Sequence, residues 1–190
     1  MASPRLPGSC YYYTKSSVSA IPTFSRILGV MQQNHIPILI EETSPREIDI
    51  DLLLLADPSV KKIRSYLPRS KCFTASVDGR VIGACVVQRF DARKHEIMSI
   101  AVHPDKQMTG VGSTLLGWVI QFVRKAGAHK LEVGTGTFGY QLAFYQRQGF
   151  RVTSIDRDFF ITNYDERVFE DGIQLLDMLR LTFDYQENRV

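Results

Sequence analysis

The sequence predicts an α/β protein built on a mixed, mostly antiparallel central sheet of six to seven strands, with helices on both faces. Two observations lead to this fold class. Apolar segments of strand length follow one another over 72–102 with only tight turns between them, as antiparallel neighbours do. From residue 111 onward, segments of helical period alternate with strand-length segments, which is typical of a sheet with helices packed against it.

Local signals define the elements of the first half. Pro37 lies in an apolar segment and places that strand at a sheet edge. Ser44 before Pro45 predicts a helix with Ser44 as its N-cap. Asp78-Gly79 predicts a hairpin turn between two strands. The elements expected here are a strand at 35–41, helices at 46–56 and 59–67, and strands at 72–77, 81–89 and 94–102.

The second half alternates between the two periods. Leu115, Leu116, Val119 and Val123 recur at helical spacing, so one face of this helix packs on the sheet, and Gly127 ends it. The elements expected here are a helix beginning at 111–113, a strand at 130–133, a short helix at 140–148, a strand at 150–155 and a last strand near 175–183.

Composition bounds the class of protein. With 190 residues and 44% hydrophobic content, the chain is long enough for one domain with a substantial core. Residues 1–34 are rich in Ser, Tyr and Pro and predict a loosely ordered extension, which leaves 35–190 as the domain. The three cysteines, Cys10, Cys72 and Cys85, show no paired spacing, so neither a disulfide framework nor a metal site is expected.

Charge and hydropathy argue against two kinds of partner. The net charge is only +3 and the basic residues are scattered, so no nucleic-acid partner is expected. No apolar run has the length needed to span a bilayer, so no membrane association is expected. Pro4, Pro7 and Gly8 lie where a signal peptide would need its apolar core, and the expected location is the cytoplasm.

A glycine-bearing loop joins the strand ending at Val102 to the helix that follows. Its pattern is Gln107-x-x-Gly110-x-Gly112. Glycines let a ligand approach the backbone, and the free N–H groups at a helix start attract an anion, so this loop predicts a phosphate site. A P-loop ATPase is disfavoured because Ser113 stands where that motif requires lysine.

A second glycine pattern supports a rival interpretation of the phosphate site. Gly134-x-Gly136-x-x-Gly139 matches a dinucleotide fingerprint, and Asp156 lies about 20 residues further on, where a ribose-binding acid is expected. The following helix is short, and too little chain remains to build the rest of a Rossmann sheet. The dinucleotide-binding interpretation is therefore the weaker one.

Two blocks together resemble the GCN5-related N-acetyltransferase (GNAT) family. The run Ser99 to Leu116 resembles the family's motif A, and Tyr145-Gln146-Arg147-Gln148-Gly149-Phe150 resembles its Tyr-x-x-x-Gly-Phe motif. The similarity covers about residues 35–185. It implies a sheet splayed in the middle, acetyl-CoA as cosubstrate and no metal. The cofactor-binding residues that it implies are Ile100, Ala101 and Val102 for the pantetheine arm, Gln107, Met108, Thr109, Gly110, Val111, Gly112 and Ser113 for the pyrophosphate, and Tyr145 near the sulfur.

The chain departs from the family at one position. Many members have an asparagine seven residues before the motif tyrosine, where this chain has Phe138. Thr137 is the candidate replacement for that contact.

The chemistry requires an acid and a base. The thiolate that leaves needs a proton, and the resemblance makes Tyr145 the general acid. An alkyl amine of pKa about 10 is only about 0.1% neutral at pH 7, so a base is useful. Glu96 is the candidate base, since it shares strand parity with Met98, Ile100 and Val102. The alternatives are His95 and His103 as bases, and Glu41 and Glu42 as groups that attract a cationic amine.

The sequence thus predicts an N-acetyltransferase that moves the acetyl group of acetyl-CoA to a primary amine by direct attack in a ternary complex. No cysteine falls in either motif, so no covalent acetyl-enzyme is expected. The alternative from another class is a non-catalytic acyl-CoA-binding module. Small amines, amino acids, aminoglycosides, polyamines and protein N-termini all fit as acceptor, and a homodimer is left open.

Overall fold

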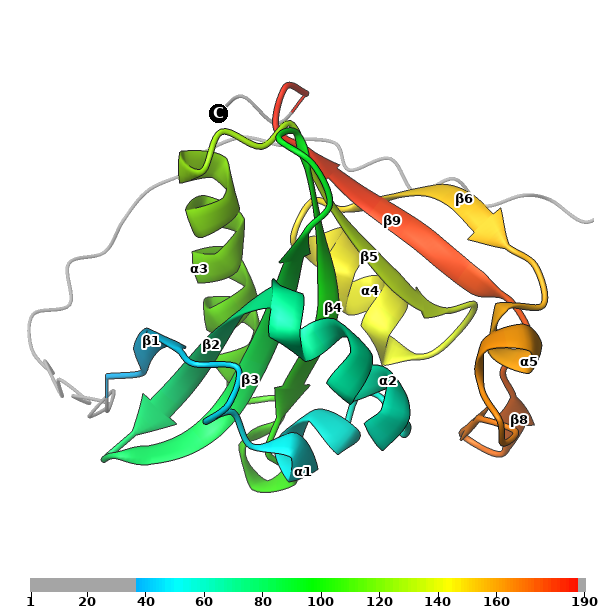
Figure 1. The fold of residues 1–190 in the computed structure, drawn as a ribbon, viewed down its shortest axis with the longest axis horizontal. Helices are drawn as coiled ribbons and strands as arrows, with labels where there is room; N and C mark the ends of the chain where they lie inside the picture. The colour runs from blue at the N-terminus through cyan, green and yellow to red at the C-terminus, as the bar shows by residue number, and fades with distance from the viewer. Residues whose placement is uncertain (1–36, 188–190) are drawn as a thin grey trace, which may run out of the picture. The chain divides into compact units, whose positions relative to one another are not determined.

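The computed structural model describes residues 37–187, which form one seven-stranded sheet with helices on both faces (Figure 1). The strand order is β1-β2-β3-β4-β5-β9-β6, and only the β4–β5 pair is parallel. The mixed, mostly antiparallel sheet predicted from the sequence is therefore confirmed. The prediction of a loosely ordered segment at 1–34 lies outside the described residues.

The elements have the following bounds. The seven strands of the sheet are β1 Leu39–Thr43, β2 Ser70–Val77, β3 Arg80–Arg89, β4 Lys94–Val102, β5 Lys130–Gly136, β6 Arg151–Asp156 and β9 Met178–Asp184. The helices are α1 Ile50–Leu54, α2 Val60–Tyr66, α3 Val111–Lys125, α4 Tyr140–Arg147 and α5 Phe159–Asn163, with short 3₁₀ turns at Leu67–Arg69 and Pro104–Lys106. A small hairpin of β7 Phe169–Glu170 and β8 Ile173–Gln174 lies between α5 and β9.

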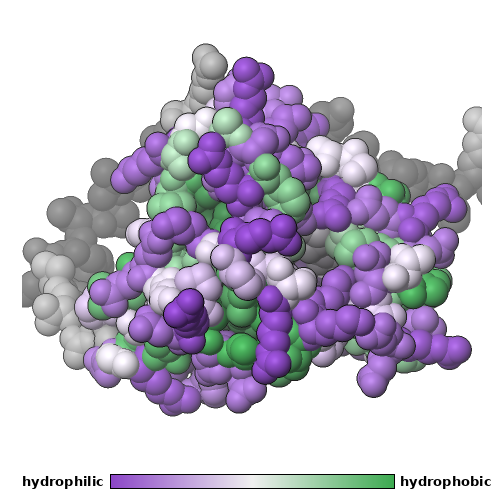
Figure 2. Space-filling view, viewed as in Figure 1, coloured by the Kyte–Doolittle hydropathy of each residue, from purple (hydrophilic) through white to green (hydrophobic). Residues whose placement is uncertain are grey.

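Two hydrophobic clusters cover the two faces of the sheet. The larger lies under α3, where Leu115, Leu116, Val119 and Val123 are fully buried at the predicted helical spacing. The smaller lies under α1 and α2. On the face seen in Figure 2, hydrophilic side chains of the described residues surround separate areas of apolar surface rather than one continuous patch.

One predicted helix begins later than expected. The sequence placed it at 46–56 with Ser44 as N-cap, but α1 begins at Ile50 and Asp49 caps it by accepting from the Asp51 N–H at 2.9 Å. The Ser44 hydroxyl instead accepts from the Arg46 N–H at 3.3 Å, which closes an isolated turn. Both residues are good caps, but Arg46 and Glu47 after Ser44 are exposed, whereas Leu52 and Leu53 after Asp49 are buried under the sheet.

The sheet opens between β4 and β5. These strands pair only from Lys94–Lys130 to Ile97–Val133 and then separate, β4 continuing to Val102 while β5 pairs with β9 as far as Gly136. The splayed sheet that the family resemblance implied is therefore present. Beyond Ile97, one edge of the β4 backbone is free to pair with something other than protein.

Candidate active site

A single cavity of about 1210 Å³ occupies the opening between β4 and β5. One half of its wall comes from β4, the loop before α3 and α4. The other half comes from the connection between α1 and α2, from α2, from the segment that runs from α5 to β9, and from the Glu96 and Ser99 side chains of β4. We refer to these as the cofactor half and the acceptor half. The two halves are contiguous, so two ligands bound in them would meet along β4.

The loop in the cofactor half leaves the start of α3 uncapped. Gly110 takes a left-handed conformation at φ +92° and no side chain caps the helix. The loop's own polar groups are paired internally: the Gln107 amide donates to the Val102 carbonyl at 3.1 Å, and the Thr109 hydroxyl to the Lys106 carbonyl at 2.7 Å. The first N–H groups of α3 are thus left for an external anion, as the glycine pattern predicted.

Most of the predicted cofactor-binding residues line this cavity. They are Ile100, Ala101, Val102, Gln107, Met108, Gly110, Gly112, Ser113 and Tyr145. Three others do not line it: Thr109 is turned back to the loop, Val111 is buried in the core, and Thr137 is exposed on the turn before α4. The contact proposed for Thr137 stays a prediction.

Tyr145 is both a core residue and part of the cavity wall. It is only 6% exposed, and its ring packs edge-on against Phe144 and Phe150 at centroid distances of 5.1 and 5.8 Å. Burial raises the pKa of its phenol above the usual range, so the hydroxyl keeps its proton at neutral pH. The position therefore offers a fixed, neutral hydrogen-bond donor.

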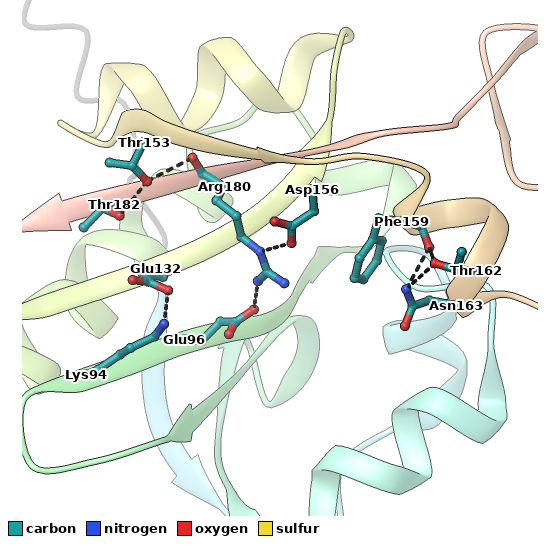
Figure 3. A network of polar contacts seen from close by, with 10 residues as sticks. All are labelled: Lys94, Glu96, Glu132, Thr153, Asp156, Phe159, Thr162, Asn163, Arg180 and Thr182. Carbon is teal, nitrogen blue, oxygen red and sulfur yellow. Dashed lines mark hydrogen bonds and ion pairs between the residues drawn. The ribbon is translucent and has the colours of Figure 1, made fainter.

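Glu96 lies in an ion-pair chain that the sequence did not predict (Figure 3). Arg180 of β9 donates from Nη1 to Glu96 Oε1 at 2.5 Å and from Nε to Asp156 Oδ2 at 2.7 Å. One Glu96 oxygen is thus already engaged by a guanidinium, which makes it less available to take a proton.

The parity argument for Glu96 was wrong. The register of β3 against β4 shifts between Val86 and Val87, which face Ser99 and Ile97, so the strand is irregular at Met98. After this point Ile100 packs toward α3, while Met98 packs toward α1 and α2. Alternation of side chains fails across such a bulge, and Glu96 does not share a face with Ile100.

The other candidate bases and acids lie outside the cavity wall. His95 is buried, and that burial lowers the pKa of its imidazole, while the His103 ring contacts the Asp105 carboxylate at 2.5 Å. Glu42 pairs with Lys71 at the β1 edge of the sheet. The expectation that Glu41 and Glu42 attract the amine is not supported by this placement.

The acceptor half is made by residues that the sequence reasoning missed. Asp57, Tyr66 and Ser99 are buried polar residues of this wall, and Lys62 reaches over the Tyr164 ring at 3.9 Å. Asp57-Pro58 had been interpreted only as a helix end. The sequence carries no signal that joins α2 to residues about 100 positions later.

The second glycine pattern serves packing. A side chain at Gly134 would meet Met178, and one at Gly139 would meet the Glu170 carboxylate. A carboxylate at the start of α4 occupies the place where a dinucleotide would put its pyrophosphate, and Asp156 is paired with Arg180. The dinucleotide-binding interpretation is therefore not supported.

The opened sheet, the uncapped helix and the shared cavity are the features of an acyltransferase. Residues 40–150 match the model of the acetyltransferase (GNAT) family, and the chain belongs to that family. It is 44% identical over 135 residues to the uncharacterized N-acetyltransferase YvbK of Bacillus subtilis, covering 70% of this chain and 87% of that protein. The recognition made from the two sequence blocks is thus confirmed.

Solved structures of acetyltransferases are similar to this chain in both sequence and fold. An IAA acetyltransferase from Bacillus cereus is 41% identical with a TM-score of 0.75, covering 78% of this chain and 99% of that one. A GNAT family acetyltransferase from Elizabethkingia anophelis with acetyl-CoA bound is 40% identical with a TM-score of 0.74, covering 77% and 97%. A Bacillus subtilis acetyltransferase in complex with CoA is 41% identical with a TM-score of 0.72, covering 78% and 99%.

Two further observations concern the described residues only. Within 37–187 no helix is long and apolar enough to cross a membrane. The same residues contain no group of three or more His, Cys, Asp or Glu side chains placed to hold a metal ion.

Proposed function

We propose that this acetyltransferase moves the acetyl group of acetyl-CoA to a primary amine by direct attack within a ternary complex. The observation that carries this proposal is the single cavity whose two halves meet along the free edge of β4. Such a cavity lets both reactants be held together before any bond breaks, which supplies proximity and orientation.

The residues of the cofactor half fit acetyl-CoA. The uncapped start of α3, from Gly110 to Ser113, matches the charge of a pyrophosphate, and the unpaired edge of β4 matches the amide-bearing pantetheine arm. No atom lies within 4 Å of the position that a Cβ would take at Gly110, so the backbone there is open to close approach. The cosubstrate supplies an activated thioester.

Direct attack is supported by the state of the cysteines. Cys72 and Cys85 are both buried and neither lines the cavity. Burial raises the pKa of Cys72 to about 11 and that of Cys85 above its usual range, so neither is a thiolate nucleophile at neutral pH. Among the described cysteines, none is suited to carry the acetyl group.

The roles in the reaction follow from position. The Ile100 backbone N–H is the proposed donor to the thioester carbonyl, and the Tyr145 hydroxyl the proposed donor to the sulfur as it leaves. Glu96 as base stays a prediction that the Arg180 ion pair weakens. A homodimer, the absence of nucleic-acid partners and a cytoplasmic location likewise stay predictions.

An acceptor screen tests the proposal. Full-length protein is incubated with acetyl-CoA and panels of small amines, amino acids, aminoglycosides, polyamines and peptides, and free thiol is measured. We expect amine-dependent thiol release with at least one class, and an acetylated product of matching mass. Binding of CoA without release for any amine would favour the non-catalytic acyl-CoA-binding module.

A further inference from the structure

The acceptor half contains two buried hydroxyl groups without hydrogen-bond partners. The Tyr66 Oη and the Ser99 Oγ have no partner of normal geometry, although each residue is only 6% exposed and both line the cavity. Buried polar atoms are nearly always paired in native proteins, so two orphans side by side in one wall point to a ligand that completes them. Each hydroxyl can accept from a donor of the ligand or donate to an acceptor of the ligand.

These hydroxyls lie where the reaction must occur. Ser99 directly precedes Ile100 on β4 and faces Val86 of β3 in the sheet. Its side chain lies near the Tyr66 hydroxyl at the end of α2, and the ring of Tyr66 belongs to the cluster under α1 and α2. A group bound to both hydroxyls would therefore sit beside the stretch of β4 proposed to hold the thioester.

A buried carboxylate stands behind them. Asp57 is 7% exposed, lies between α1 and α2, and lines the same cavity. Its Oδ1 accepts from the Ser59 N–H at 3.1 Å, and the Tyr164 hydroxyl from the C-terminal segment also hydrogen-bonds to it. Unlike Glu96, it is in no ion pair of the described residues shorter than 4.0 Å.

The charged and titratable groups around Asp57 come from four parts of the chain. Lys62 and Tyr66 face it from α2 and Tyr164 from the C-terminal segment, while Arg180 of β9 and Cys72 of β2 act on Lys62 and Tyr66. Burial raises the pKa of the Asp57 carboxyl, and Lys62 and the two hydrogen bonds oppose that rise. A carboxylate raised in this way is a better proton acceptor than an exposed one.

We propose that the acceptor ammonium binds to the hydroxyls of Tyr66, Ser99 and Tyr164, and that Asp57, acting through the Tyr164 hydroxyl that hydrogen-bonds to it, receives the proton that the amine must lose. An ammonium has three donors, two of which satisfy the orphan oxygens while the third reaches Tyr164. This deepens the proposed function and rests on it. Ser99, Tyr66 and Tyr164 are the groups that contact the amine, and Asp57 is a positioning residue.

The protons and bonds balance. The ammonium gives one proton to the Tyr164 hydroxyl as that hydroxyl passes its own proton to the Asp57 carboxylate. The neutral amine nitrogen then bonds to the thioester carbon, and the C–S bond breaks. Tyr145 gives its proton to the thiolate and is reprotonated by the second proton that leaves the amide nitrogen, so the products are an amide, CoA thiol and protonated Asp57. Asp57 returns its proton to solvent before the next cycle.

Asp57→Asn tests the carboxylate with little structural change, because an amide oxygen can still accept from the Ser59 N–H. Asp49→Asn is the matched control: Asp49 makes the same contact two residues on, to the Asp51 N–H, but is exposed and outside the cavity wall. With an amine that the wild type acetylates, we expect Asp57→Asn to lower kcat/KM by about 100-fold or more, within the range for general-base catalysis. Asp49→Asn should remain within about twofold of wild type.

The pH profile separates a proton acceptor from a structural role. Wild-type kcat/KM should fall as pH drops through the raised pKa of Asp57, and that acid limb should be absent from Asp57→Asn. A weakly basic amine that is already neutral at pH 7 should restore most of the lost activity to the variant. CoA affinity should not change in either variant.

Substitutions of Tyr66 and Ser99 test the two hydroxyls separately from Asp57. Tyr66→Phe and Ser99→Ala should lower kcat/KM for the amine while leaving the Tm unchanged or raised, because each removes an unpaired buried polar group. If wild type acetylates amines but Asp57→Asn keeps its activity and acid limb, the proton path is wrong and the proposed function stands. If no amine supports turnover by wild type, the proposed function itself fails.

Discussion

The two halves of the cavity differ in how the chain builds them. The cofactor half is nearly continuous in sequence: β4, the loop and the start of α3 follow one another from Lys94 to Ser113. The acceptor half joins α2 to a segment about 100 residues later, for example through Lys62 over the rings of Phe159 and Tyr164 at 4.7 and 3.9 Å. A local motif can specify the first half, whereas only the folded sheet brings the second together.

The halves also differ in chemistry. The cofactor half offers backbone N–H groups and few charges, which suits a ligand whose phosphates are invariant. The acceptor half combines carboxylates, cations and aromatic rings, among them Asp57, Glu96, Lys62 and Arg180. Because these side chains are set by separate elements, they can vary without disturbing the phosphate site. Substitutions in the two halves should therefore have separable kinetic effects.

The largest effect is expected at the loop. Gly110→Asp places a like charge beside the phosphates and a side chain at φ +92°, so the Kd for CoA should rise by at least about 100-fold. Gly117→Asp puts the same charge in the middle of α3, where no atom lies within 4 Å of the position that a Cβ would take, and should leave the Kd unchanged. Calorimetric titration with CoA measures both. Equal CoA affinity for the two variants would remove the loop from the site.

Tyr145→Phe is expected to change turnover without changing affinity. The substitution keeps the ring packing against Phe144 and Phe150 and removes only the donor, so kcat should fall about 10- to 100-fold while the Kd for CoA stays within about twofold. Tyr185→Phe is the control, since its buried hydroxyl donates to the Ile120 carbonyl at 2.9 Å, outside the cavity wall. It should lower the Tm and leave kcat intact. A full rate for Tyr145→Phe would contradict its role as the acid.

In the acceptor half, Phe159→Ala should change the KM for the amine and leave CoA binding unchanged. The Phe159 ring lies under Lys62 and Arg180, at 4.7 and 5.8 Å, so its loss should raise KM for the amine by about three- to tenfold. The Kd for CoA should not change. Phe169→Ala removes a ring that is 58% exposed and outside the cavity wall, and should change neither constant. A rise in the CoA Kd for Phe159→Ala would show that the halves are not separable.

One half of the cavity is nearly continuous in sequence and the other is not, and this difference explains which features could be predicted from the sequence. The glycine loop, the helical spacing of α3 and the hairpin at Asp78-Gly79 are local patterns, and the structure contains all three. The Glu96–Arg180 ion pair joins residues 84 positions apart, and the strand irregularity at Met98 depends on the register with β3. No local pattern encodes either, so the sequence could show neither that Glu96 and Ile100 lie on different faces of β4 nor that Glu96 pairs with Arg180.

Glu96→Gln should have the smallest effect and still decides between two carboxylates. The amide oxygen can accept from Arg180 Nη1, so the chain to Asp156 is retained and the fold should be undisturbed. If Asp57 receives the proton, kcat/KM for the amine should fall by less than about 10-fold, below the usual range for loss of a general base. The pH profile of kcat/KM should keep its acid limb.

The contrary result would be equally informative. A loss of about 100-fold or more on Glu96→Gln, with the acid limb gone, would return the base to Glu96 and leave Asp57 with the structural role of accepting from the Ser59 N–H. The Arg180 contact would then hold the carboxylate in place for catalysis rather than withdraw it. Measuring Glu96→Gln and Asp57→Asn over the same pH range, with the same amine, therefore assigns the proton to one carboxylate.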